Sequence, residues 1–112
     1  WVICLDWQRK PNRGPHHASP TMIVLTQDNE IEYRYDYYMY GQFMKFVKRG
    51  AYRIFSTPGD RYINNVSFLN PDGKLVLVVA NAENNNKVIG VKSENICFEY
   101  EIPPKSVITF IW

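Results

Sequence analysis

Paired carboxylates come nearest to a reactive arrangement in this sequence. Glu30 and Glu32 stand two apart in one predicted strand, and Glu99 and Glu101 repeat that spacing in another. Two such residues share a strand face at about 6.6 Å, which overlaps the separation of the two acids in glycoside-hydrolysing enzymes. Any polar strand face produces this spacing, and nothing in the sequence would make one acid a proton donor. Both pairs are therefore interpreted as solvated strand faces.

Histidines and cysteines are too few and too scattered to predict a metal or redox site. His16 and His17 are adjacent, so their side chains diverge in an extended loop, and no spacing typical of zinc ligands occurs. They are interpreted as polar loop residues, with a ligand-facing role as the alternative. Cys4 and Cys97 stand among apolar neighbours and are interpreted as buried free thiols, with a disulfide between them as the alternative. No cofactor is expected.

Aromatic residues make up 15% of the chain, and many cluster in its first forty residues. Flat aromatic faces stack on sugar rings, but aromatics are also ordinary core material. The tyrosines of the expected helix, Tyr37, Tyr38 and Tyr40, are interpreted as core or interdomain packing, whereas Trp1 and Trp7 fit packing and binding equally well. Asn65-Val66-Ser67 matches a glycosylation sequon, but its place inside a predicted strand argues against its use.

Length and composition are those of a globular domain. With 112 residues, 46% hydrophobic and 21% charged, the chain can bury a core without metal or disulfides. The net charge of +2 and the absence of a basic block predict no nucleic-acid partner, and no apolar run is long enough to span a membrane. The chain opens at Trp1 rather than Met, which is typical of a fragment or a processed piece.

The front part, residues 1–50, is expected to contain one helix. A strand at 1–5 precedes a long loop at 6–20, a hairpin at 21–34 and a helix at 36–49. The helix follows from the apolar stripe Tyr40, Phe43, Met44 and Val47, with Asp36 as its N-cap and Gly50 after its end. Gly41 inside the helix suggests close backbone packing there.

The rest of the chain, residues 51–112, is expected to be all β. A Pro-Asp-Gly turn falls at 70–73, and the apolar run at 75–80 predicts a central strand. Further strands are expected at 51–56, 62–69, 87–92, 97–102 and 106–112. We therefore predict a mainly β fold, an antiparallel β-sandwich of about six to eight strands with one α-helix near residues 36–49.

Four motifs, in the right order, resemble those of one family. Trp1-Val2-Ile3-Cys4-Leu5-Asp6 resembles a "WNLALN" strand, and Tyr38–Val47 resembles a "YxxGHFSKFI" helix. Asn70–Asn81 is similar to an "NPDGSxVxVVxN" hairpin, and Ile102–Trp112 is similar to an "xPxxSIxTxxW" terminus. Together they resemble glycoside hydrolase family 30, which includes acid β-glucosylceramidase.

The resemblance implies a (β/α)₈ catalytic barrel with a β-sandwich attached. Residues 1–50 would be the last βα unit of the barrel, and residues 51–112 would belong to the C-terminal sandwich. The family's two catalytic glutamates lie on barrel strands that would precede Trp1, so no residue here is expected to be catalytic and the chain alone should be inactive. The family's sandwich also includes strand material from the N-terminus of the full enzyme. The resemblance alone implies a secreted, periplasmic or lysosomal-type compartment.

One binding position carries over from the family. Trp1 matches the tryptophan that lines the sugar subsite, and residues 6–19 would form a rim loop of the barrel. Asp6, Trp7 and His16 in this loop join Trp1 as candidate substrate-binding residues. The loop is shorter than in the glucosylceramidase pattern, so other β-linked glucans or xylans remain open as substrates.

Three hypotheses follow for the function. The leading one is a non-catalytic C-terminal part of a retaining β-glycosidase that braces the catalytic barrel. Its partner would be that missing barrel, or its exposed apolar surface would drive self-association. The alternatives are an independent carbohydrate-binding β-sandwich module and a plain structural or interaction β-domain.

Overall fold

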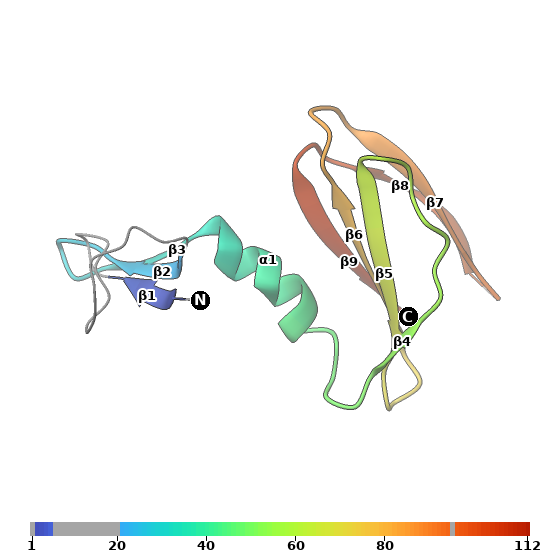
Figure 1. Ribbon diagram of the computed structural model, residues 1–112, viewed down its shortest axis with the longest axis horizontal. Helices are drawn as coiled ribbons and strands as arrows, with labels where there is room; N and C mark the ends of the chain where they lie inside the picture. Colours follow the sequence, from blue (N-terminus) through green and yellow to red (C-terminus); the bar gives the residue numbers. More distant parts are fainter. Residues whose placement is uncertain (1, 6–20, 95) are drawn as a thin grey trace. The chain divides into compact units, whose positions relative to one another are not determined.

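The computed structural model describes residues 2–5, 21–94 and 96–112. The chain divides into two compact units, Trp1–Gly41 and Gln42–Trp112 (Figure 1). The boundary falls inside helix α1 (Tyr35–Met44), which begins in the first unit and ends in the second.

The first unit contains a three-stranded sheet in the order β1-β2-β3. β1 (Val2–Leu5) runs parallel to β2 (Thr21–Leu25), and β3 (Ile31–Tyr33) pairs antiparallel with β2. Asn29 sits in the β2–β3 turn with a φ of 63°, a left-handed conformation that asparagine tolerates better than most residues. The predicted first strand and hairpin are confirmed, whereas the parallel pairing of β1 with β2 was not predicted.

The second unit is a two-layered β structure. One layer is an antiparallel sheet in the order β4-β5-β6-β9, formed by β4 (Tyr52–Ile54), β5 (Ile63–Leu69), β6 (Leu75–Asn81) and β9 (Ser106–Ile111). The other layer is a hairpin of β7 (Lys87–Ser93) and β8 (Ile96–Ile102). β6 is central, as its apolar sequence predicts, and the mainly β fold is confirmed.

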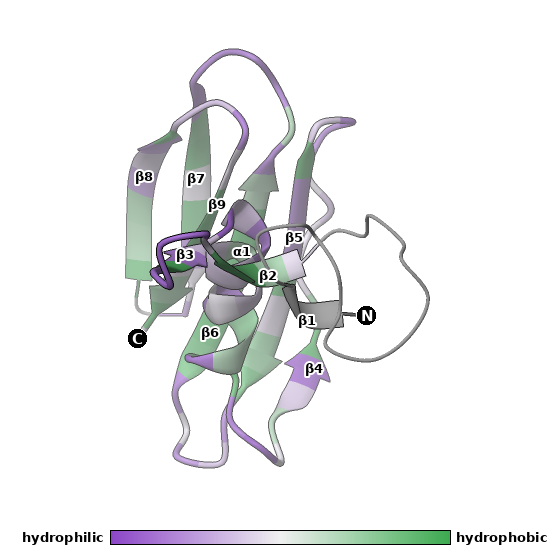
Figure 2. Ribbon diagram, turned by 90° about the vertical axis from the view of Figure 1, so that its left-hand side faces the viewer, coloured by the Kyte–Doolittle hydropathy of each residue, from purple (hydrophilic) through white to green (hydrophobic). Residues whose placement is uncertain are grey.

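The core lies between these two layers. Ile63, Val79 and Ile102 are buried together, and around them pack Leu77, Ile89, Ile108 and Phe110. The rings of Phe98 and Tyr100 lie 5.2 and 5.3 Å from that of Phe110, which joins the hairpin to β9. Hydrophobic colour runs along β6, while the loops at the ends of the strands are hydrophilic (Figure 2). Burial of apolar surface between the layers is therefore the main stabilising contribution.

The helix is shorter than predicted. It begins at Tyr35 and ends at Met44, not at residue 49, and Asp36 lies in its first turn and not at the N-cap. A residue distant in the sequence accounts for the earlier end. The side chain of Asn70 hydrogen-bonds the carbonyl oxygen of Phe46 and the N–H of Lys48, in place of further helical hydrogen bonds. Gly50 then takes a φ of 86°, the left-handed conformation expected of it.

Two further expectations are wrong. No described atom lies within 4 Å of a Cβ built on Gly41, so the expected close backbone packing is absent among the described residues. Cys97 is free and exposed, since it lies on the outward-facing side of β8, opposite Lys92 in the β7–β8 register. It was expected to be buried because its neighbours Ile96 and Phe98 are apolar, but in the described part of the chain only the opposite face of this hairpin is covered.

Candidate functional site

The buried side chain of Asn70 holds the segment that follows the helix. Asn70 is 2% exposed and starts the turn between β5 and β6. Its Nδ2 donates to the carbonyl oxygen of Phe46 at 2.9 Å, and its Oδ1 accepts from the backbone N–H of Lys48 at 3.0 Å. One side chain thus satisfies two backbone groups that the end of the helix leaves open.

An ion pair reinforces the same junction. Lys48 Nζ lies 2.6 Å from Asp72 Oδ2, and this ammonium is the main reason that the pKa of Asp72 is lowered. The Lys48 and Asp72 side chains are both partly open to solvent, so the pair contributes little by itself. Gly50 lies against Pro71, since a Cβ on this glycine would come 3.5 Å from the proline ring.

A third contact ties the last turn of α1 to β9. Thr109 Oγ1 lies 3.1 Å from the carbonyl oxygen of Gln42 and 2.9 Å from its Oε1. We call these contacts of Asn70, Lys48, Asp72, Gln42 and Thr109 the helix clamp. They fix the backbone and side chains where the helix ends, which is a structural role.

An open groove of about 680 Å³ lies on the inner face of the four-stranded sheet. Its lining includes inward residues of β5 and β6, the connection at 55–60 and all seven residues of β7. It exists because one layer has four strands and the other has two. The hairpin packs over β9, so no strand among the described residues covers the part of the inner face near β4 and β5.

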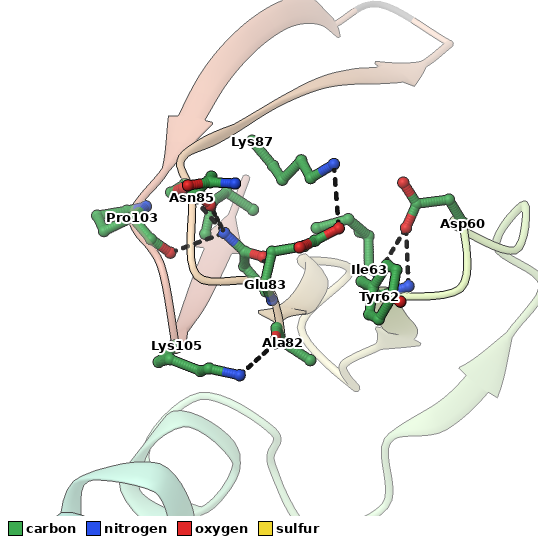
Figure 3. A network of polar contacts seen from close by, with 11 residues as sticks. Asp60, Tyr62, Ile63, Ala82, Glu83, Asn85, Lys87, Pro103 and Lys105 are labelled. Atoms are coloured by element: carbon green, nitrogen blue, oxygen red, sulfur yellow. Dashed lines mark hydrogen bonds and ion pairs between the residues drawn. The ribbon is translucent and has the colours of Figure 1, made fainter.

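A polar network closes one end of the sandwich (Figure 3). The amide nitrogen of the buried Asn81 lies 2.9, 3.2 and 2.9 Å from the carbonyl oxygens of Asn85, Ile102 and Pro103. Its Oδ1 accepts from the N–H of Glu83, which forms an ion pair with Lys87 at 3.4 Å. These contacts join β6 to the loop before β7 and to the end of β8, which is a structural role.

Asp60 lies in the connection that precedes β5. Its Oδ1 accepts from the N–H groups of Tyr62 and Ile63 at 2.8 and 2.9 Å, and these two bonds lower the pKa of Asp60 (Figure 3). Within the described ranges, no three His, Cys, Asp or Glu side chains come together in a way that could hold a metal ion. No helix there is long and apolar enough to cross a membrane.

The candidate substrate-binding residues Trp1, Asp6, Trp7 and His16 all lie outside the described residues. The acid pairs are described, and all four glutamates are exposed, as expected of solvated strand faces. Glu32 forms an ion pair with Arg34, and Glu101 accepts a hydrogen bond from Asn86.

The tyrosines around the helix are not core residues in the described structure. No residue of α1 is buried, and the exposed aromatics include Tyr33, Tyr35, Tyr37 and Tyr38. The rings of Tyr33 and Tyr37 lie 4.5 Å apart and those of Tyr37 and Tyr38 lie 5.4 Å apart. Packing against another domain remains a prediction for this group.

Comparison with known proteins now decides the family. The model of the glycosyl hydrolase family 30 beta sandwich domain matches residues 50–110, which include all strands of the second unit except the last residue of β9. The chain belongs to glycoside hydrolase family 30.

Relatives in family 30 are much longer than this chain. Lysosomal acid glucosylceramidase of Mus musculus is 25% identical over all of this chain, which spans 22% of that protein. Endo-1,6-beta-D-glucanase BGN16.3 of Trichoderma harzianum is 29% identical over 88% of this chain, which again spans 22% of the relative. The structure of the endo-beta1,6-glucanase BT3312 superimposes with a TM-score of 0.86 at 29% identity, over all of this chain and 26% of that one. The chain therefore spans about a quarter of the length of the relatives it matches.

Proposed function

We propose that this chain is the non-catalytic C-terminal part of a retaining β-glycosidase and that it braces the catalytic barrel. The observation that carries the proposal is the match of residues 50–110 to a family 30 sandwich domain in a chain that spans only about a quarter of its relatives. The two acid pairs of the sequence, Glu30 with Glu32 and Glu99 with Glu101, are exposed to solvent.

The brace acts through helix α1. Its C-terminal end is held to the sandwich by the helix clamp, while large apolar side chains stay exposed along it, including Tyr35, Tyr38 and Met44 at 59%, 58% and 77%. Exposed apolar surface of this kind favours a protein contact. The rest of the barrel would cover these side chains, and the clamp would carry that contact into the sandwich.

The groove is the second point of attachment. A segment from elsewhere in the enzyme would lie over the uncovered part of the inner face and complete the two-stranded layer. In the same enzyme Trp1 would line the sugar subsite, with Asp6, Trp7 and His16 in the rim loop beside it. The substrate class would be β-linked glucosides or glucans.

Hydrolysis of an aryl β-glucoside tests the proposal. A preparation with an intact mass near 13.2 kDa should show no turnover. Turnover at that mass would refute the proposal, because it would require a catalytic pair inside this chain. Titration with β-glucan oligosaccharides is the second arm, and saturable binding by the chain alone would favour the carbohydrate-binding module instead.

Bracing has its own readout in the longer enzyme. Asn70→Ala should lower the temperature at which hydrolytic activity is lost and leave KM unchanged, because the clamp holds the fold and does not touch substrate. Asn84→Ala is the matched control, since this exposed loop residue makes no side-chain hydrogen bond to the described residues. Equal inactivation temperatures for the two variants would contradict a bracing role.

A further inference from the structure

Asp72 is the only aspartate or asparagine in the sequence that is followed directly by glycine. In such a pair the backbone nitrogen of the glycine can attack the side-chain carboxyl carbon, because glycine has no side chain to hinder the approach. Asp72 and Gly73 lie in the turn between β5 and β6 and are both exposed, so water reaches them. The sequence and the exposure of this turn together indicate a site of spontaneous chemical modification.

The modification needs only the chain and water. A bond forms between the Gly73 nitrogen and Cγ of Asp72, and the carboxyl hydroxyl leaves with the amide proton as one molecule of water. A second water molecule then opens the five-membered succinimide ring. Attack at Cγ restores aspartate, whereas attack at the former main-chain carbonyl carbon gives isoaspartate, in which the main chain runs through Cβ. Nothing is oxidised or reduced in either step.

Three contacts of the turn oppose ring closure. Lys48 Nζ lies 2.6 Å from Asp72 Oδ2, and a carboxylate held by an ammonium is a poorer electrophile than the protonated acid, whose hydroxyl leaves as water. Asp72 Oδ1 also accepts from the N–H of Lys74 at 3.3 Å. The N–H of Gly73 donates to the carbonyl oxygen of Asn70 at 2.9 Å. The two groups that must react with each other are therefore both engaged elsewhere.

The space around the turn does not restrain the reaction. No described atom lies within 4 Å of a Cβ built on Gly73, so the ring has room to form. Polar contacts are left as the restraint, and among them the ion pair with Lys48 is the one made by two side chains. The lowered pKa of Asp72 agrees with this assignment, since its largest cause is the hydrogen bond from Lys48.

Isoaspartate at position 72 would alter the turn that places Asn70. Two backbone bonds close this turn, from the Asn70 N–H to the Lys74 carbonyl oxygen and from the Gly73 N–H to the Asn70 carbonyl oxygen, both at 2.9 Å. An additional main-chain carbon between them changes the geometry of both bonds. The carboxylate would also start from a different carbon and would no longer be placed for Lys48. The helix clamp would lose its ion pair and the fixed position of its central residue.

We propose that Asp72-Gly73 is a site of isoaspartate formation and that Lys48 is the residue that restrains it. The contact that joins the end of α1 to the β5–β6 turn thus has a second role, because it also delays the chemical ageing of that turn. Isomerisation in turn opens the clamp. This role depends on the clamp and not on the rest of the enzyme, so it can fail while the proposed function stands.

Prolonged incubation of the 112-residue chain in mildly acidic buffer, below its melting temperature, tests the proposal. Methylation of the digested protein by protein L-isoaspartyl methyltransferase measures isoaspartate, and electron-transfer fragmentation of the peptide that contains residue 72 assigns it. Lys48→Met should raise the rate about twofold to fivefold, as expected when a partly exposed ion pair is lost. Lys45→Met is the matched control, because it removes the same charge from the same segment and its ammonium lies over the Phe46 ring.

Two conservative variants assign the effect to the proposed atoms. Lys48→Arg keeps a cation beside the carboxylate and should retain most of the protection. Asp72→Glu should give no isomerised product at this position, because the longer side chain would have to close a six-membered ring, which forms far more slowly. The isomerised fraction of the wild type, isolated by chromatography, should melt at a lower temperature than the unmodified fraction.

The chain unfolded in urea supplies the unrestrained rate. A folded wild type that isomerises as fast as the unfolded chain would overturn the protective role of the turn. Equal rates in the wild type, Lys48→Met and Lys45→Met would overturn the role of Lys48, and a slower rate in Lys48→Met would do the same, since the ammonium would then assist ring closure. Absence of isoaspartate from folded Lys48→Met, over a time in which the unfolded chain accumulates it, would overturn the site itself.

Discussion

Replacing Asn70 by alanine removes the centre of the helix clamp. The substitution deletes one donor and one acceptor, at 2.9 Å from the Phe46 carbonyl oxygen and 3.0 Å from the Lys48 N–H. The backbone bonds of the turn stay available to alanine, because the N–H of residue 70 reaches the Lys74 carbonyl oxygen and its own carbonyl oxygen accepts from Gly73. The effect therefore isolates the side chain.

The size of the effect follows from burial. Each intramolecular hydrogen bond contributes about 1 kcal/mol net, and a buried group left without a partner costs about 1–3 kcal/mol. Asn70 is only 2% exposed and both of its bonds are part-buried, so two bonds with incomplete access of water give a loss of about 2–4 kcal/mol. For a domain of this size that loss lowers the melting temperature by roughly 10–20 °C.

Thermal and urea unfolding followed by circular dichroism provide the assay. Asn84→Ala should melt within a few degrees of the wild type, because that exposed side chain bonds nothing described. Asn70→Asp should also destabilise, since it keeps the acceptor for Lys48 but places an oxygen against the carbonyl oxygen of Phe46. If Asn70→Ala melts no lower than Asn84→Ala, the clamp does not hold the helix end and the reasoning fails.

Three further changes test other parts of the structure. Gly59→Ala should destabilise strongly in a melt, because its Cβ would lie 2.1 Å from the Ile63 carbonyl oxygen; an unchanged melting temperature would contradict that close approach. Gly41→Ala should raise stability by about 1 kcal/mol, since no described atom crowds that helix position; a loss would reveal a packing partner. Asp60 and Asp72 have pKa values lowered from 3.8, so they stabilise the fold above about pH 4 and that stability is lost as the pH falls through their folded-state pKa values. Melting temperatures measured from neutral to acid pH should fall there, and less steeply in Asp72→Asn.

Local patterns predicted most of the fold because most of its elements depend on nearby residues. The alternation of Phe98, Glu99 and Tyr100 indicates a strand with one covered face, and β8 spans Ile96–Ile102. The Asn-Pro-Asp-Gly stretch indicates a turn, and Gly73 has the positive φ of 82° that such a turn needs. Both signals lie within a few residues of the structure they produce.

The end of the helix and the face of Cys97 depend on distant residues. Asn70 lies 24 positions from Phe46 and 22 from Lys48, so no pattern around residues 36–49 could show where the helix ends. Cys97 stands between apolar neighbours, yet its burial depends on whether anything covers the outer face of β7 and β8. The groove also could not be predicted from a local pattern. It exists because the two layers differ in their number of strands, which no motif encodes.

The helix clamp and the groove differ in how completely this chain supplies hydrogen-bond partners for their polar groups. The helix clamp pairs both polar functions of Asn70 within this sequence, so its strength belongs to the chain itself. The groove leaves Asn65 Oδ1 and the free edge of β7 without partners among the described residues. Buried acceptors and bare strand edges are unfavourable in an isolated fold. The polar groups of the clamp are therefore paired by this chain alone, whereas those of the groove are not paired by the described residues.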